Sequence, residues 1–182
     1  EGGPDGELDR FLAEHGWTAE GHATVRTAPL HPLTERPGEQ EVRLTREPGE
    51  GWTARYQRTG RLSSDAYRVL VGGPSVWFAT VPADEPGSPP LATGRCVVDG
   101  RGAGFAAVEV APERRRRGLA TAVMAALAAR AAEEGADCAY LQVEASNDAA
   151  DALYNALGFT VHHAYHYRRA PSGGKGQEAG AG

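Results

Sequence analysis

The chain has 182 residues, a length that suits one domain, with or without an appendage, and permits a sizeable core. A formal net charge of -5 and a pI of about 5.7 argue against a general nucleic-acid binder. The sequence has no apolar run of membrane-spanning length and no signal-peptide core, so we expect a cytoplasmic protein with neither a nucleic-acid nor a membrane partner.

Hydrophobic periodicity predicts a mixed series of helices and strands. The chain opens with a short helix over 8–14, whose apolar side carries Leu8, Phe11 and Leu12, and then a strand over 23–28. A proline-containing linker over 29–41 follows. Beyond it we expect strands over 42–45, 69–71, 76–81, 91–98, 104–110, 139–144 and 160–168, helices over 52–58, 63–67, 117–134 and 147–157, and a disordered tail over 171–182.

An arginine-rich turn joins the strand over 104–110 to the helix over 117–134. The first N–H groups of a helix lack partners within the helix, and the helix dipole adds positive potential there, so a strand–turn–helix unit is a ready anion site. Gly118 lets a ligand approach the backbone closely, and the run from Arg114 to Arg117 supplies positive charge suited to phosphate oxygens. We therefore expect this turn to bind a polyphosphate.

Two segments resemble the signatures of a known family. Arg115-x-x-Gly118-x-Ala120 is similar to the signature Q/R-x-x-G-x-G/A, and the segment from Asn147 to Phe159 resembles N-x-x-A-x-x-L-Y-x-x-x-G-F. Both signatures belong to the GNAT superfamily of acetyl-CoA-dependent N-acetyltransferases, and they occur here in the family's order. The resemblance implies an α/β GNAT fold. Its central sheet is mixed but mostly antiparallel and flanked by helices, and the family's fourth and fifth strands are parallel and splay apart.

The resemblance implies a GNAT domain over 41–170, preceded by an extension over 1–40. The segment from Phe11 to Trp17 aligns without gaps on the segment from Leu153 to Phe159. We hypothesise that the extension is the closing helix and strand of a degenerate upstream GNAT half. Chance similarity between two common helix–glycine–strand segments is the alternative. We expect the strand over 23–28 to pair with a sheet edge, in this chain or in a second copy, because an unpaired apolar edge is a liability.

The resemblance further implies that acetyl-CoA binds as a cosubstrate and that no metal takes part. In the family, backbone groups at the arginine turn hold the pyrophosphate, and the pantetheine arm lies between the splayed strands. The implied binding residues are Arg115, Arg116, Arg117, Gly118, Leu119 and Ala120, with Thr121 close behind, Val110 near the thioester carbonyl and Asn147 at the pantetheine. Asn147 has a second interpretation as a helix N-cap, which needs no ligand.

Tyr154 is the general acid that the resemblance implies, placed to protonate the departing CoA thiolate; a tyrosine that only packs is the alternative. The general base is less clear. Glu109 lies between Val108 and Val110, so strand alternation turns it away from the core and toward the substrate side. Glu144 has the same relation to its own strand. Either carboxylate could accept a proton through water, attract a cationic acceptor, or be a solvated or ion-paired surface group.

The implied reaction is direct transfer of acetyl to an amine in a ternary complex, with a small-molecule or peptide amine as the partner. A covalent enzyme intermediate is not expected, since Cys96 and Cys138 fall outside both signatures. A homodimer, or packing against a companion GNAT half, is the expected protein contact. The rival interpretation is a non-catalytic acyl-CoA-binding scaffold. His162 and His166 share one strand face while His163 points the other way, which disfavours a metal site.

Overall fold

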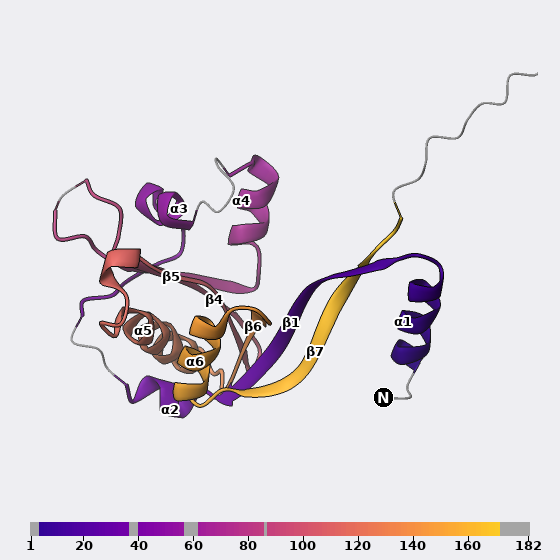
Figure 1. Ribbon diagram of the computed structural model, residues 1–182. Coiled ribbons are helices and arrows are strands. Elements are labelled where there is room, and N and C mark those ends of the chain that lie inside the picture. The colour runs from indigo at the N-terminus through magenta and orange to yellow at the C-terminus, as the bar shows by residue number, and fades with distance from the viewer. Residues whose placement is uncertain (1–3, 37–39, 57–61, 86, 172–182) are drawn as a thin grey trace, which may run out of the picture.

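The computed structural model describes residues 4–36, 40–56, 62–85 and 87–171, which fold around one seven-stranded sheet with the order β2-β3-β4-β5-β6-β1-β7 (Figure 1). The strands are β1 (Thr18–Pro29), β2 (Arg43–Thr45), β3 (Ser75–Val81), β4 (Ala92–Asp99), β5 (Gly102–Val110), β6 (Cys138–Glu144) and β7 (Thr160–Arg169). The helices are α1 (Pro4–Glu14), α2 (His31–Thr34), α3 (Glu50–Tyr56), α4 (Ser64–Val71), α5 (Leu119–Glu133) and α6 (Asp148–Ala156), with a 3-10 turn η1 (Pro112–Arg114). Neighbouring strands pair antiparallel except β5 and β6, which are parallel. The predicted α/β class with a mixed sheet is confirmed.

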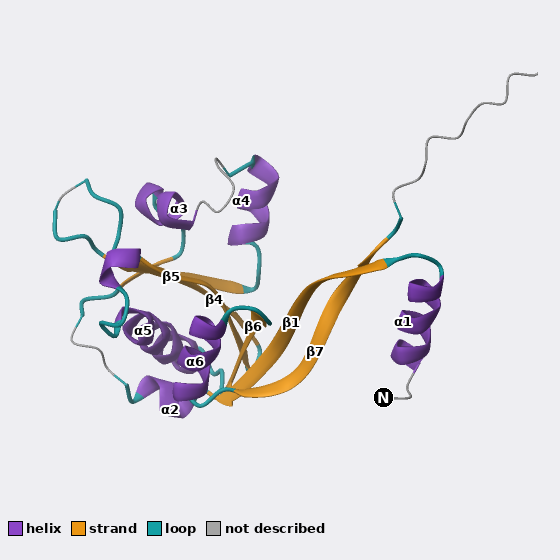
Figure 2. Cartoon of the chain, in the orientation of Figure 1, coloured by secondary structure: helices purple, strands orange, loops and turns teal. Residues whose placement is uncertain are grey.

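Helices cover the two faces of the sheet unequally (Figure 2). On one face α5, α6 and α2 pack against the larger core, which includes Phe105, Met124 and Phe159. On the other face α3 and α4 lie over the β3–β5 part, where Trp52 and Phe78 belong to a second, smaller cluster. The side chains that β6 directs toward this second face are exposed. The sheet is therefore covered on both faces at one end and on one face at the other.

The parallel strands β5 and β6 separate part of the way along their length. They pair only between residues 102–105 and 138–141. Beyond that point β5 contains a bulge, where Ala107 has a φ of 53° and the pairing with β4 shifts between Thr93 and Arg95. A bulge bends the strand that carries it and increases its twist. Thus β5 continues alongside β4 and leaves β6, which is the splayed pair that the resemblance implied.

Strand β1 lies inside the sheet, between β6 and β7. Its residues 23–29 pair with β6, and its residues 18–27 pair with β7. The predicted pairing of the strand over 23–28 is confirmed, although the strand is flanked on both sides rather than added to an edge. Toward Thr18, β1 and β7 continue as a two-stranded arm that leaves the rest of the sheet and carries α1 near its tip (Figure 1). The descent of residues 1–40 from an upstream half stays a prediction.

One predicted strand is part of a helix instead. Residues 69–71, which we expected as a strand, are the last turn of α4. Ser63 caps the start of this helix, where its side chain accepts a hydrogen bond from the N–H of Ala66, and Gly72 ends it by donating its N–H to the carbonyl of Val69. A well-formed N-cap is worth about 1 kcal/mol, more than the few tenths by which each valine disfavours a helix.

The expected linker over 29–41 contains structure as well. It includes α2, and Leu30 and Leu33 are fully buried in the larger core. Its prolines are compatible with this because one stands at the start of the helix, where a missing N–H costs nothing. The expected helix over 52–58 is confirmed through Tyr56. The end of that helix and most of the expected tail lie outside the described residues.

The other predicted elements are present within a few residues of the expected bounds. None of the helices in the described ranges is both long and apolar enough to cross a membrane.

Candidate functional site

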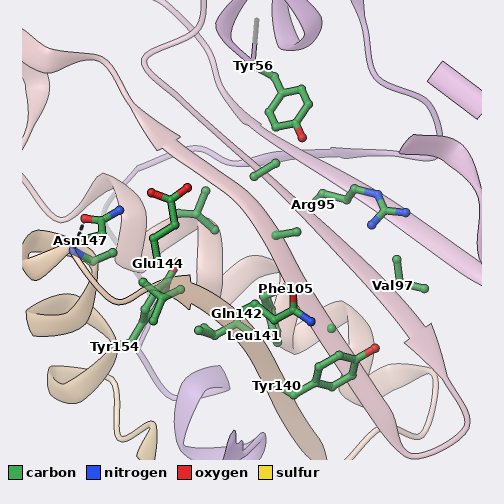
Figure 3. A pocket seen from close by; sticks show the side chains of 16 residues that line it. Tyr56, Arg95, Val97, Phe105, Tyr140, Leu141, Gln142, Glu144, Asn147 and Tyr154 are labelled. Atoms are coloured by element: carbon green, nitrogen blue, oxygen red, sulfur yellow. Dashed lines mark hydrogen bonds between the residues drawn. The ribbon is translucent and has the colours of Figure 1, made fainter. Parts of the chain in front are cut away.

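The gap between β5 and β6 opens into a cavity of about 370 Å³. Its walls come from β4, β5 and β6, from α6 and its N-cap, and from the last residue of α3. Figure 3 shows Glu144, Asn147 and Tyr154 at one end of the cavity and Arg95 and Tyr140 at the other. The cavity therefore reaches from the α6 end of the gap to the face of the sheet that α3 and α4 cover.

The arginine turn has a backbone conformation that exposes its N–H groups. Arg116 and Gly118 have φ values of 59° and 77°, both in the left-handed region. Among the described residues, no backbone carbonyl accepts from the N–H groups of 116–118, and α5 begins immediately afterward at Leu119. The side chains of 115–117 are exposed and form no ion pair within the described ranges. Successive free N–H groups in such a conformation form an anion-binding concavity.

A buried cation on β1 positions helix α6. Arg26 is only 4% exposed and donates to Asn155 Oδ1 at 2.8 Å and to the carboxylate of Asp151. Asn155 in turn donates to the other carboxylate oxygen of Asp151 at 3.0 Å. These bonds join the N-terminal strand to the helix that carries Tyr154. The segment over 1–40 is therefore bonded to α6, one of the elements that form the cavity wall.

Tyr154 is buried and lines the cavity. Its ring packs edge-on against Phe159 with the ring centroids 5.7 Å apart. The structure therefore shows the tyrosine both packed in the core and present at the cavity wall. Its role as a general acid stays a prediction.

Asn147 is the N-cap of α6. Its Oδ1 accepts a hydrogen bond from the N–H of Ala150 at 3.1 Å, which confirms the capping interpretation. The residue also lines the cavity beside Glu144. A contact with the pantetheine arm is compatible with this position and stays a prediction.

The N–H of Val110 is directed toward the gap. The next residue, Ala111, donates its N–H to the carbonyl of Leu91, on the β4 side, at 2.8 Å. N–H groups alternate between the two edges of a strand, so that of Val110 points to the opposite edge, from which β6 has diverged. The role of this N–H near a thioester carbonyl stays a prediction.

The two candidate carboxylates have different positions. Glu144 lines the cavity, at the end of β6. Glu109 lies opposite Thr93 of β4, on the face away from Val108 and Val110, which pack against the larger core. Strand alternation therefore holds for Glu109 as expected. The assignment of a general base to either residue stays a prediction.

Several cavity residues were not identified from the sequence: Tyr56, Arg95, Tyr140 and Gln142. They come from α3, β4 and β6, and only the fold brings them together. In the sequence, Gly104 is the residue that could have indicated where the Tyr140 ring lies. A Cβ at Gly104 would lie 2.6 Å from the Tyr140 ring, so the absence of a side chain there gives the ring its place over β5.

The cysteines and histidines take no visible part in this site. Cys96 is buried in the larger core, and that burial raises the pKa of its thiol to about 12. Cys138 is exposed at the start of β6. Within the described ranges, no group of three or more His, Cys, Asp or Glu side chains is arranged to hold a metal ion.

Comparison with known proteins relates this geometry to acetyltransferases. Residues 8–168 match a protein family described as "Probable histone acetyltransferase Rv0428c C-terminal". Over 72 residues the chain is 40% identical to an uncharacterized N-acetyltransferase, YobR, of Bacillus subtilis (strain 168). That match covers 40% of this chain and 29% of the relative, so it spans less than a third of the relative's length.

Solved structures share the fold. A GCN5-related N-acetyltransferase from Kribbella flavida superposes with a TM-score of 0.65 at 21% identity, over 91% of this chain and 64% of that one. The aminoglycoside N-acetyltransferase AAC(6')-Iy, solved in complex with CoA, superposes with a TM-score of 0.54 at 15% identity, over 66% of this chain and 91% of that one.

Proposed function

Because this chain belongs to the GNAT N-acetyltransferases, in the family of the Rv0428c C-terminal region, we propose that it transfers acetyl from acetyl-CoA to an amine. The observation that carries the proposal is the gap between β5 and β6, with the N–H of Val110 directed into it. The family description names a histone acetyltransferase. For this chain we propose a primary amine on a small molecule or a peptide as the acceptor.

The residues fit a CoA thioester at both of its ends. The N–H groups of 116–118, together with those of Leu119, Ala120 and Thr121 in the first turn of α5, would bind the pyrophosphate. The exposed arginines of 115–117 add positive charge at the same turn. The gap between the strands would receive the pantetheine arm, close to Asn147 at the start of α6.

The reaction forms one bond and breaks one. The amine nitrogen of the acceptor bonds to the thioester carbonyl carbon, and the carbon–sulfur bond breaks, so an N-acetyl amide and CoA leave. Val110 would donate its N–H to the thioester oxygen, which gains negative charge as the amine attacks. A donor held in place stabilises that charge more in the transition state than in the ground state.

Two proton transfers complete the reaction. Tyr154 would donate its phenolic proton to the departing sulfur, and so act as the general acid. A carboxylate would accept the proton that the amine loses, directly or through water. Glu144, which lines the cavity, and Glu109, on the neighbouring strand, are the proposed bases. No covalent enzyme intermediate is proposed.

Release of the CoA thiol with a panel of amines, and mass detection of the N-acetyl product, tests this function. In Tyr154→Phe we expect turnover to fall by roughly a hundredfold or more, the usual contribution of a general acid, with acetyl-CoA affinity unchanged. Tyr167→Phe, on the exposed arm, is the matched control and should retain full activity. Binding of acetyl-CoA without any acetylated amine would instead indicate a scaffold, and full activity of Tyr154→Phe would remove the acid assignment.

A further inference from the structure

Arg95 is a partly buried cation at the end of the cavity away from Tyr154. Its Nε donates to the carbonyl of Leu70 at 2.6 Å, and its Nη2 donates to the carbonyl of Gly72 at 2.9 Å. Both carbonyls lie at the C-terminal end of α4. These two bonds fix the plane of the guanidinium. Its Nη1 forms no hydrogen bond, and no carboxylate forms an ion pair with it, within the described ranges.

The C-terminal end of α4 compensates only part of the positive charge of Arg95. The C-terminus of α4 offers partial negative charge, which favours a cation nearby. That charge is fractional, whereas the guanidinium carries a full positive charge at any physiological pH. Burial lowers the pKa of Arg95, as expected for a charge with incomplete compensation. A fixed cation with no anionic partner among the described residues therefore forms part of the cavity wall.

Two phenols lie around the same end of the cavity. Tyr56 extends from the end of α3, and Figure 3 shows its hydroxyl directed toward the cavity. Tyr140 extends from β6, with its ring placed by the missing side chain of Gly104. A phenol O–H can donate to an oxyanion, as a guanidinium can. Arg95, Tyr56 and Tyr140 thus gather hydrogen-bond donors that suit a carboxylate or a phosphate.

Arg95 and Glu144 lie at the two ends of the cavity. Arg95 belongs to β4 and Glu144 to β6, with β5 between them. Two spacings between paired strands would separate their backbones by roughly 10 Å across the sheet, and the divergence of β6 from β5 adds to that separation. Their side chains shorten this span, so an acceptor that touches both ends needs several bonds between its two polar groups.

Building on the proposed acetyl transfer, we propose that the acceptor carries an oxyanion, a carboxylate or a phosphate, several bonds from its reacting amine. Arg95 binds that oxyanion with Tyr56 and Tyr140, while the amine reaches the end of the cavity near Val110 and Tyr154. Arg95 is in this account the residue that selects the acceptor.

Matched acceptors test the proposal with acetyl-CoA and the full chain. δ-Aminovalerate has a carboxylate where n-pentylamine has a methyl group and where cadaverine has an aminomethyl group. We expect kcat/KM for δ-aminovalerate to exceed that for n-pentylamine by roughly ten- to a hundredfold, the factor that a charge-assisted hydrogen bond supplies. Cadaverine should be the poorest of the three. An aminoalkyl phosphate of the same length distinguishes a carboxylate site from a phosphate site.

Variants of Arg95 separate recognition from folding. Arg95→Gln should lower kcat/KM for δ-aminovalerate far more than that for n-pentylamine, so that the ratio of the two values falls toward one. Arg95→Lys should recover part of the preference, because the charge remains and the forked geometry is lost. Arg68→Gln removes an exposed arginine of α4 and is the matched control, which should keep the wild-type ratio. A ratio unchanged by Arg95→Gln overturns the proposal.

Failure of this proposal and failure of the proposed reaction give different results. Acetylation of n-pentylamine and δ-aminovalerate at equal rates overturns the anion site and leaves the transferase function intact. If no amine is acetylated, calorimetry of δ-aminovalerate with the CoA-loaded protein still decides the matter. Binding that Arg95→Gln abolishes supports the anion site, and absence of binding overturns it.

Discussion

The two ends of the sheet are held together by different forces. At the β2–β5 end, helices pack on both faces, and Phe78 and Trp52 are fully buried with their rings edge to face. At the β6–β1–β7 end, one face lacks such a cover, and β7 is mostly exposed along its length. The first end is stabilised by apolar burial. The second has apolar burial on one face only, and it depends in addition on strand pairing and on a few polar contacts.

Those polar contacts extend to the tip of the arm. Asp9 of α1 accepts a hydrogen bond from Arg168 Nε at 2.7 Å and lies 2.7 Å from His166 Nε2. The bond from Arg168, with that from His166, holds the pKa of Asp9 well below its usual range. In contrast, Leu8 and Phe11 of the same helix are 58% and 54% exposed. The cavity lies where the two ends of the sheet meet, between a part covered on both faces and a part covered on one.

The largest expected effect is a loss of stability at the β2–β5 end of the sheet. Phe78→Ala should lower the free energy of unfolding by about 3–5 kcal/mol, because it leaves a cavity beside Trp52 in a site with no access to water. Tyr167→Ala, on the exposed arm, should change it by less than about 0.5 kcal/mol. Urea denaturation of both variants measures the difference. Equal losses would show that the two ends of the sheet are equally packed.

The next largest effect concerns the contact between β1 and α6. Arg26→Met removes hydrogen bonds to Asp151 and Asn155, and should cost about 2 kcal/mol because these bonds involve charged groups and Arg26 is buried. Turnover should fall as well, since α6 carries Tyr154. Arg36→Met is the matched control, because exposed Arg36 also bonds to α6, at the carbonyl of Ala156, yet should change neither stability nor rate.

Loss of stability without any change in the KM or kcat of the folded Arg26→Met protein would contradict a positioning role. It would show that the bonds of Arg26 hold the strand but not the geometry around Tyr154.

A smaller effect is the pH dependence of the free energy of unfolding, which again arises at the β2–β5 end. Hydrogen bonds from Ser75 and Trp77 lower the pKa of Glu134 from 4.5 to about 2. Because the folded-state pKa is the lower one, the stabilisation is present above about pH 4.5 and is lost as the pH falls toward 2. Glu134→Gln should therefore be less stable than the wild type at pH 7, and the gap should narrow by pH 3 in urea denaturation. A gap that widens in acid would contradict this sign.

The sequence predicted those elements that local pattern determines. The predicted helices over 117–134 and 147–157 each have a residue that fixes a boundary: Gly135, whose φ is positive, follows the first, and Asn147 caps the start of the second. The strand predicted over 69–71 was wrong. Three consecutive β-branched or apolar residues suit a strand and a helix end equally well, and only the caps at Ser63 and Gly72 distinguish the two.

The other features of the fold and of the cavity depend on contacts between residues far apart in the sequence. A strand pattern over 23–28 shows that the segment is extended, but not that it lies between β6 and β7, because period-two alternation carries no information about partners. The arginine turn could be proposed as a cofactor site because its residues are consecutive. Arg95, Tyr56 and Tyr140 were missed because they come from three separate elements, and only the divergence of β5 from β6 gathers them.

Calorimetric titration of acetyl-CoA into the wild type and into Gly118→Glu tests the central claim that the arginine turn and the β5–β6 gap bind this cosubstrate. Gly100→Glu is the matched control. Gly100 also has a positive φ, of 55° against 77° for Gly118, and neither site has an atom within 4 Å of the added Cβ. We expect binding to the wild type and to Gly100→Glu, and loss of binding in Gly118→Glu, where a carboxylate would occupy the anion site. Equal binding by all three proteins, or none by the wild type, would contradict the account.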